Sequence, residues 1–98
     1  MLRQSTVRPL AQADLEDAAS WYELQQSGLG LRFLHAVDQV LNRVCETPLQ
    51  FPLVSVGVRR ALVHTFPYAV YFGEMDQAVV ILAVLHLRRD PRVWRERS

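Results

Sequence analysis

Residues 78–97 read AVVILAVLHLRRDPRVWRER, and this stretch does most to decide the fold. Its first eight residues are apolar, which predicts a buried central strand running from Ala78 to His86. The remainder carries five arginines against two acids, together with a tryptophan. Asp90 and Pro91 are typical of a short helical turn with an aspartate cap, so Trp94 is expected to fold back onto the domain. A solvated basic tail is the alternative interpretation.

Two further strands are predicted upstream of this run. Residues 68–74 (YAVYFGE) are rich in aromatic and β-branched side chains, which favour a strand. Residues 56–65 alternate like a strand, but neither face is cleanly apolar, so its inward side stays open. Three successive strands with short connections imply an antiparallel meander.

The N-terminal half predicts a short strand and two helices. Residues 4–10 suit an edge strand that ends near Pro9. Residues 11–26 and 31–46 repeat apolar side chains at helical spacing, and the glycines of Ser27–Gly30 separate them as a tight turn. The expected fold is α+β in the order β-α-α-β-β-β. An antiparallel two-helix hairpin packs on a twisted antiparallel sheet of three to four strands, followed by a short basic C-terminal helix or tail.

Composition bounds the class of protein. The chain has 98 residues, of which half are hydrophobic, so we expect a single domain spanning residues 1–98. A single cysteine, Cys45, excludes an internal disulfide. The N-terminus lacks the apolar core of a signal peptide, and the longest apolar run is too short to span a bilayer. We therefore expect a cytoplasmic protein that does not enter a membrane.

Charge is unevenly distributed along the chain. The net charge is +1, but residues 59–98 hold seven arginines against four acids. All eleven basic residues are arginine. Arginine provides a fixed charge and a planar fork for phosphate or carboxylate, and no lysine is present to act as a general base.

No motif indicates a cofactor or a metal. The three histidines and one cysteine lack metal-ligand spacing, and neither a GxSxG elbow nor a Gly-rich phosphate loop is present. The remaining candidates for a functional site are basic side chains. If their strands are neighbours, Arg59 and Arg60 converge at one sheet edge with His86, Arg88 and Arg89. Such a cluster suits a phosphodiester or an acidic protein surface.

Several segments together resemble the RelE/ParE toxins of bacterial toxin–antitoxin systems. They are DLEDAASWYE at 14–23, Val-Arg-Arg at 58–60, FPYAVYF at 66–72 and VLHLRRDPRVWR at 84–95. The last is the most specific, and the pattern is similar to the ParE-like branch. The resemblance covers residues 5 to 97.

The resemblance implies a toxin of a plasmid-stabilisation-like module. It implies a cognate acidic antitoxin, expected to cover an apolar groove between helices and sheet with arginines at its rim. ParE-like members poison DNA gyrase, whereas RelE-like members cleave mRNA on the ribosome, and the shared fold does not choose between them. The expected target-contact residues are Arg59, Arg60, His86, Arg88, Arg89, Arg92 and Trp94.

Two alternatives stay open beside the gyrase reading, so whether the chain is an enzyme is undecided. A RelE-like endoribonuclease would use His86 as proton carrier, with Arg59, Arg60 and Arg89 holding phosphate. The absence of lysine, and Trp94 where RelE-like nucleases usually have a tyrosine, favour the ParE-like branch. The other alternative is an antitoxin-binding domain with little toxicity.

Overall fold

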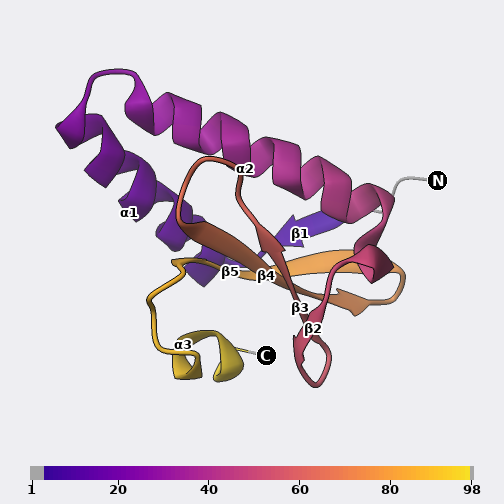
Figure 1. Cartoon of the computed structure of the whole chain (residues 1–98). Helices are drawn as coiled ribbons and strands as arrows, with labels where there is room; N and C mark the ends of the chain where they lie inside the picture. The colour runs from indigo at the N-terminus through magenta and orange to yellow at the C-terminus, as the bar shows by residue number, and fades with distance from the viewer. Residues whose placement is uncertain (1–3, 98) are drawn as a thin grey trace.

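The fold, seen here in a computed structural model that describes residues 4–97, is a helical hairpin laid on one face of a twisted sheet (Figure 1). The elements are β1 (Ser5–Val7), α1 (Pro9–Gln25), α2 (Leu29–Glu46), the 3-10 turn η1 (Pro48–Gln50), β2 (Leu53–Ser55), β3 (Val58–Leu62), β4 (Tyr68–Met75), β5 (Ala78–His86) and α3 (Arg92–Arg95). The α+β class, the helical hairpin and the bounds of β5 are confirmed.

The sheet has five strands in the order β1-β5-β4-β3-β2. The prediction of three to four antiparallel strands was therefore too low, and it was wrong for β1, which pairs with β5 in parallel. The first strand does lie at an edge, as expected. It stops at Val7 because Pro9, placed in the expected edge strand, instead occupies the first turn of α1, where a missing N–H costs nothing.

The strand expected over residues 56–65 is shorter than predicted, since β3 covers only Val58–Leu62, and β2 lies before the predicted range and was missed. β2 and β3 form a hairpin around Gly57, whose φ of +73° suits glycine, and Val56 at the turn is 97% exposed. The open question of its faces is also settled: Ala61 and Val63 point toward the helices, whereas Val58 points to the opposite side. The residues alternate as a strand should, but both faces are covered.

The helical hairpin is closed by a glycine contact. Gly28, with φ of +87°, precedes α2, and the Glu23 carboxylate accepts the N–H groups of Gly28 and Gly30. A Cβ on Gly30 would lie 2.5 Å from the carbonyl oxygen of Ala19. Only glycine lets the two helices approach this closely.

Two apolar clusters lie on opposite faces of the sheet. The larger joins the hairpin to the sheet through Phe33, Val37 and Val40 of α2 and buried residues such as Phe72 and Ile81. The smaller lies under α3, which Figure 1 shows on the far side of the sheet from α1 and α2. The short C-terminal helix is thus part of the folded domain.

Candidate functional site: an arginine loop and a C-terminal latch

The predicted cluster at one sheet edge does not form as expected. β4 lies between β3 and β5, with Arg60 opposite Tyr71 and His86 opposite Tyr68. Two strand spacings and three residues of rise separate the backbones of Arg60 and His86 by roughly 14 Å. The condition on which their convergence depended, that β3 and β5 are neighbours, is therefore not met.

Arg59 and Arg60 also point to opposite faces of the sheet. Arg59 faces the helical side, where its Nη1 donates to the Phe51 carbonyl at 2.7 Å. Arg60 alternates to the face that carries α3, because its neighbour Val58 and its cross-strand partner Tyr71 pack there. Arg59 therefore braces the η1–β2 segment, and Arg60 lies beside the outer cluster.

His86 ends β5 with one ring nitrogen already engaged. Its Nδ1 accepts the backbone N–H of Arg88 at 3.0 Å, and its ring lies edge-on to Tyr68 with centroids 5.3 Å apart. An accepting Nδ1 places the proton of the neutral ring on Nε2. The two nitrogens of His86 are thus not equivalent, and only Nε2 remains for other partners.

The loop after His86 presents the arginines to solvent. Arg88 and Arg89 are exposed, and the Arg89 N–H donates to the His86 carbonyl at 2.9 Å. Arg92 is also exposed but contacts Asp90 at 2.7 Å. Hydrogen bonds from the Arg92 side chain and then from its backbone lower the pKa of Asp90, so the charge of Arg92 is balanced by that of the Asp90 carboxylate.

The predicted cap of α3 is displaced by one residue. Asp90 Oδ1 accepts the N–H of Arg92 at 2.9 Å, and Pro91 occupies the cap position in place of the first helical turn. The aspartate still turns the chain into α3.

Trp94 is a packing residue of the outer face. Its indole stacks on Tyr71 with centroids 4.9 Å apart and planes 13° from parallel, and it is only 5% exposed. It folds back onto the domain, as the sequence predicts. The role of target contact does not suit it, because its ring faces are covered. It fixes α3 beneath the arginine loop instead.

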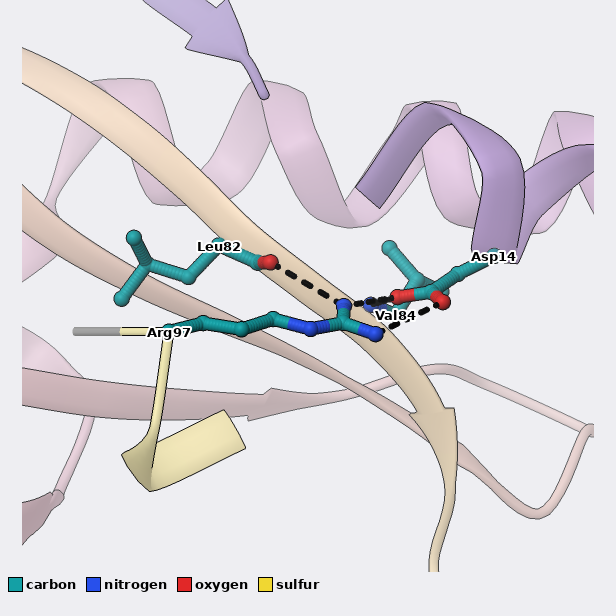
Figure 2. Close-up of polar contacts among 4 residues, drawn as sticks. All are labelled: Asp14, Leu82, Val84 and Arg97. Carbon is teal, nitrogen blue, oxygen red and sulfur yellow. Dashed lines mark hydrogen bonds and ion pairs between the residues drawn. The ribbon is translucent and has the colours of Figure 1, made fainter. Parts of the chain in front are cut away.

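An ion pair that the sequence did not reveal anchors the C-terminus. Figure 2 shows the Arg97 guanidinium reaching Asp14 of α1, with Nη1–Oδ2 at 2.6 Å and Nη2–Oδ1 at 3.3 Å. The two side chains are only 16% and 14% exposed. We call this pair the C-terminal latch. Asp14 precedes the apolar stripe of α1 by one residue, and Arg97 lies 83 positions away, so no local pattern links them.

The latch also provides hydrogen-bond partners for backbone groups at the open edge of β5. β1 pairs with β5 only as far as Ile81, and no other strand among residues 4–97 continues along that edge. Past that point, Asp14 Oδ2 accepts the Val84 N–H at 3.0 Å and Arg97 Nη1 donates to the Leu82 carbonyl at 3.3 Å (Figure 2). The ion pair replaces the hydrogen bonds that a strand would provide.

The chain is similar to known toxins over most of its length. Residues 6–91 match the family described as ParE toxin of type II toxin-antitoxin system, parDE. The chain belongs to the ParE toxin family. The match ends at Pro91, so α3 and the arginine of the latch lie outside the matched residues.

The ParE fold is also evident from a solved structure. A chain of the chromosomal ParDE TA system from P. aeruginosa superposes with a TM-score of 0.77 at 17% identity, covering 87% of this chain and 96% of that one. No curated protein sequence matches the chain. The similarity therefore shows the ParE fold, and the family match shows membership.

A groove of this ParE-family chain lies along α2. It has a volume of about 910 Å³ and is mainly apolar. Leu31 and Leu34 are exposed in it, the segment 64–66 forms its other wall, and Arg32 and His35 contribute cationic or polar groups. Among residues 4–97, no helix is long and apolar enough to cross a membrane, and no group of three or more potential metal ligands occurs.

Proposed function

We propose that the chain is a ParE-like toxin that inhibits DNA gyrase and is neutralised by a cognate antitoxin. Membership of the ParE family over residues 6–91 is the observation that carries this proposal. Both the proposed target and the proposed partner place its action in the cytoplasm.

The exposed arginine loop is the proposed contact with gyrase. Arg88, Arg89 and Arg92 lie on a segment held at His86 by hydrogen bonds and at Trp94 by packing, and Arg60 lies on the same outer face as Trp94. A fixed set of exposed guanidinium groups suits a surface of carboxylates or phosphates. Arg59 supports this surface indirectly, because its guanidinium is bonded to Phe51.

The same geometry weighs against an endoribonuclease site. That alternative requires Arg59, Arg60, Arg89 and His86 to surround one phosphodiester. Arg59 and Arg60 face opposite sides of the sheet, and the backbones of Arg60 and His86 are separated by roughly 14 Å. A binding function of the loop needs no such convergence.

Supercoiling by purified DNA gyrase tests the proposal. With ATP present, we expect the chain to inhibit supercoiling and to accumulate cleaved DNA. Arg88→Ala together with Arg89→Ala should abolish inhibition while the far-UV circular dichroism stays unchanged. Arg43→Ala, on the exposed face of α2, is the control for lost positive charge and should inhibit like the parent. Full inhibition by the double variant would remove the loop from the proposal.

Growth arrest without any effect on gyrase would reject the proposed target. Cut sites within codons of translated mRNA would then support the RelE-like activity, and induction without growth arrest would support an antitoxin-binding domain.

The groove along α2 is the proposed docking surface for the antitoxin. It lies between α2 and the segment 64–66, its lining is mainly apolar, and its charged lining residues are Arg32 and Asp38. These features suit an amphipathic segment with acidic residues along its edge. Leu31→Glu with Leu34→Glu should prevent co-purification with the antitoxin. Leu24→Glu, which changes a more exposed leucine near the hairpin turn and outside the groove, should not. Equal retention of both variants would place the antitoxin elsewhere.

A further inference from the structure

A second, smaller cleft opens where the latch ends. It has a volume of about 240 Å³ and lies between α1 and the adjoining ends of β4 and β5. Its walls are formed by Asp14, Asp17, Ala18, Trp21, Tyr68, Val84, Leu85, His86 and Arg89. The volume is below the roughly 300–1,000 Å³ of pockets for drug-sized ligands. An interacting helix is therefore too large for it, and only the flat ring of a ligand fits inside, with the attached groups at the mouth of the cleft.

The side chains of the cleft supply three different chemistries. α1 contributes two carboxylates, from Asp14 and Asp17. The aromatic surface comes from Trp21, which is 56% exposed, and from Tyr68. Arg89 provides a cation close enough to Tyr68 to lower the pKa of its phenol, opposing the larger upward effect of burial. A matching ligand carries a hydrogen-bond donor, a flat ring and an anion.

The backbone adds polar groups to the same wall. The Val84 N–H and the Leu82 carbonyl face outward, where the latch holds them. With the two-residue period of a strand, the Val84 carbonyl and the His86 N–H face the same way. Val84 and His86 both line the cleft, and no strand among residues 4–97 covers this edge. The Val84 carbonyl and the His86 N–H therefore need polar partners other than a neighbouring strand.

We propose that this cleft binds a single unpaired nucleotide whose base carries an exocyclic amine. The base stacks on Trp21, its amine donates to Asp17, and its phosphate lies at Arg89. Aromatic side chains provide stacking surfaces for unpaired bases, carboxylates accept from base amines, and arginine binds phosphate. This inference goes beyond gyrase inhibition, and binding to the purified chain tests it independently of toxicity.

A basic side chain from a partner protein fits the cleft less well. Asp17 and Trp21 suit a cation, but the Asp14 carboxylate is already neutralised by Arg97. Arg89 also lines the cleft, where it would repel a second guanidinium. A nucleotide uses both the acidic and the basic wall.

The two indole N–H signals give a direct measurement. The chain contains two tryptophans, one in the cleft and one in α3, buried against Tyr71 of the sheet, so a ¹H–¹⁵N correlation spectrum reports both. Titration with AMP should shift the Trp21 signal to saturation, with a Kd in about the millimolar range or tighter. The Trp94 signal should stay in place. Trp21→Phe assigns the two peaks.

Variants separate the three contacts. Arg89→Gln should weaken AMP by about tenfold, the loss expected for one charged hydrogen bond, and should leave adenosine unaffected. Arg43→Gln is the charge control and should bind AMP normally. UMP, which has no exocyclic amine, should bind more weakly than AMP. Asp17→Asn should remove that difference, because an amide can accept from the amine of AMP and can also donate to the carbonyl of UMP.

The source of the nucleotide is distinguished by a single-stranded oligoadenylate. Saturation at a concentration at least about tenfold below that of AMP indicates a nucleic-acid strand, and equal concentrations indicate a free nucleotide. Either result supports the cleft. The absence of a saturable Trp21 shift, equal binding of AMP, UMP and adenosine, or a shift produced by free arginine in place of AMP would overturn the assignment.

Discussion

Removing the carboxylate of the C-terminal latch should cost more stability than its surface position suggests. Asp14→Ala deletes the acceptor of the Val84 N–H at 3.0 Å and the partner of Arg97 at 2.6 Å. A net hydrogen bond to a charged group contributes about 1.5–3 kcal/mol. The long side chain of Arg97 can turn its guanidinium into solvent, so the larger cost of a stranded buried charge does not apply. We expect a loss of about 3 kcal/mol.

Urea unfolding followed by far-UV circular dichroism measures this loss. Since 1 kcal/mol shifts the Tm of a domain of this size by roughly 4–8 °C, thermal melting should fall by about 12–24 °C. Asp14→Asn keeps an acceptor for Val84 and should lose about half as much. Asp17→Ala, the exposed aspartate one turn along α1, is the control and should change stability by less than about 0.5 kcal/mol.

A double-mutant cycle separates the ion pair from the strand edge. Arg97→Gln should cost about 1.5 kcal/mol, and the cost should nearly disappear when Asp14 is already alanine. Additive losses would show that the two side chains do not act together. An Asp14→Ala variant within about 0.5 kcal/mol of the parent would refute the view that the pair completes the edge of β5.

Three other consequences follow from the packing. Trp94→Ala should cost about 3 kcal/mol and release α3, whereas Trp94→Phe keeps most of the stack; urea unfolding compares them. Gly30→Ala should destabilise by about 1–3 kcal/mol, because its Cβ would meet the Ala19 carbonyl oxygen at 2.5 Å, and a parental Tm would contradict this contact. Burial raises the pKa of Tyr22 and of Tyr68 above the usual 10.0. Their contribution to stability is therefore full below about pH 10 and is lost as pH rises through the folded-state values. Tyrosinate absorbance should show both phenols ionising late in the folded chain, and ionisation at pH 10 would refute it.

Elements with strong local periodicity were predictable from sequence. The strand Ala78–His86 was predicted with its observed bounds, and both long helices begin within two residues of the predicted positions. An unbroken β-branched run and a wide apolar stripe leave few alternatives for the chain. Where the local signal was weak, around Gly57, the prediction began the strand at Val56, inside the turn, and missed β2 before it.

Features that depend on distant partners were not predictable. β1 is too short to encode its direction, and its parallel pairing with β5 follows from the path of the chain through the hairpin and the meander. The faces of Arg59 and Arg60 depend on the register with β4, and the latch joins positions 83 apart. Spacing along the sequence carries no information on such contacts.

The arginine loop combines exposure with a fixed position. Most exposed loops lose conformational entropy when they bind, at roughly 0.5–1.5 kcal/mol for each side chain that becomes immobile. Here the Arg88 N–H is held by His86, and the Leu87 N–H donates to the Pro67 carbonyl at 2.9 Å. At the other end, Trp94 is buried on Tyr71 and the latch follows it. The backbone that carries the arginines is therefore restrained on both sides, so binding must order only their side chains. Variants of the latch should then weaken target binding without removing any contact residue, which would distinguish a positioned loop from a free basic tail.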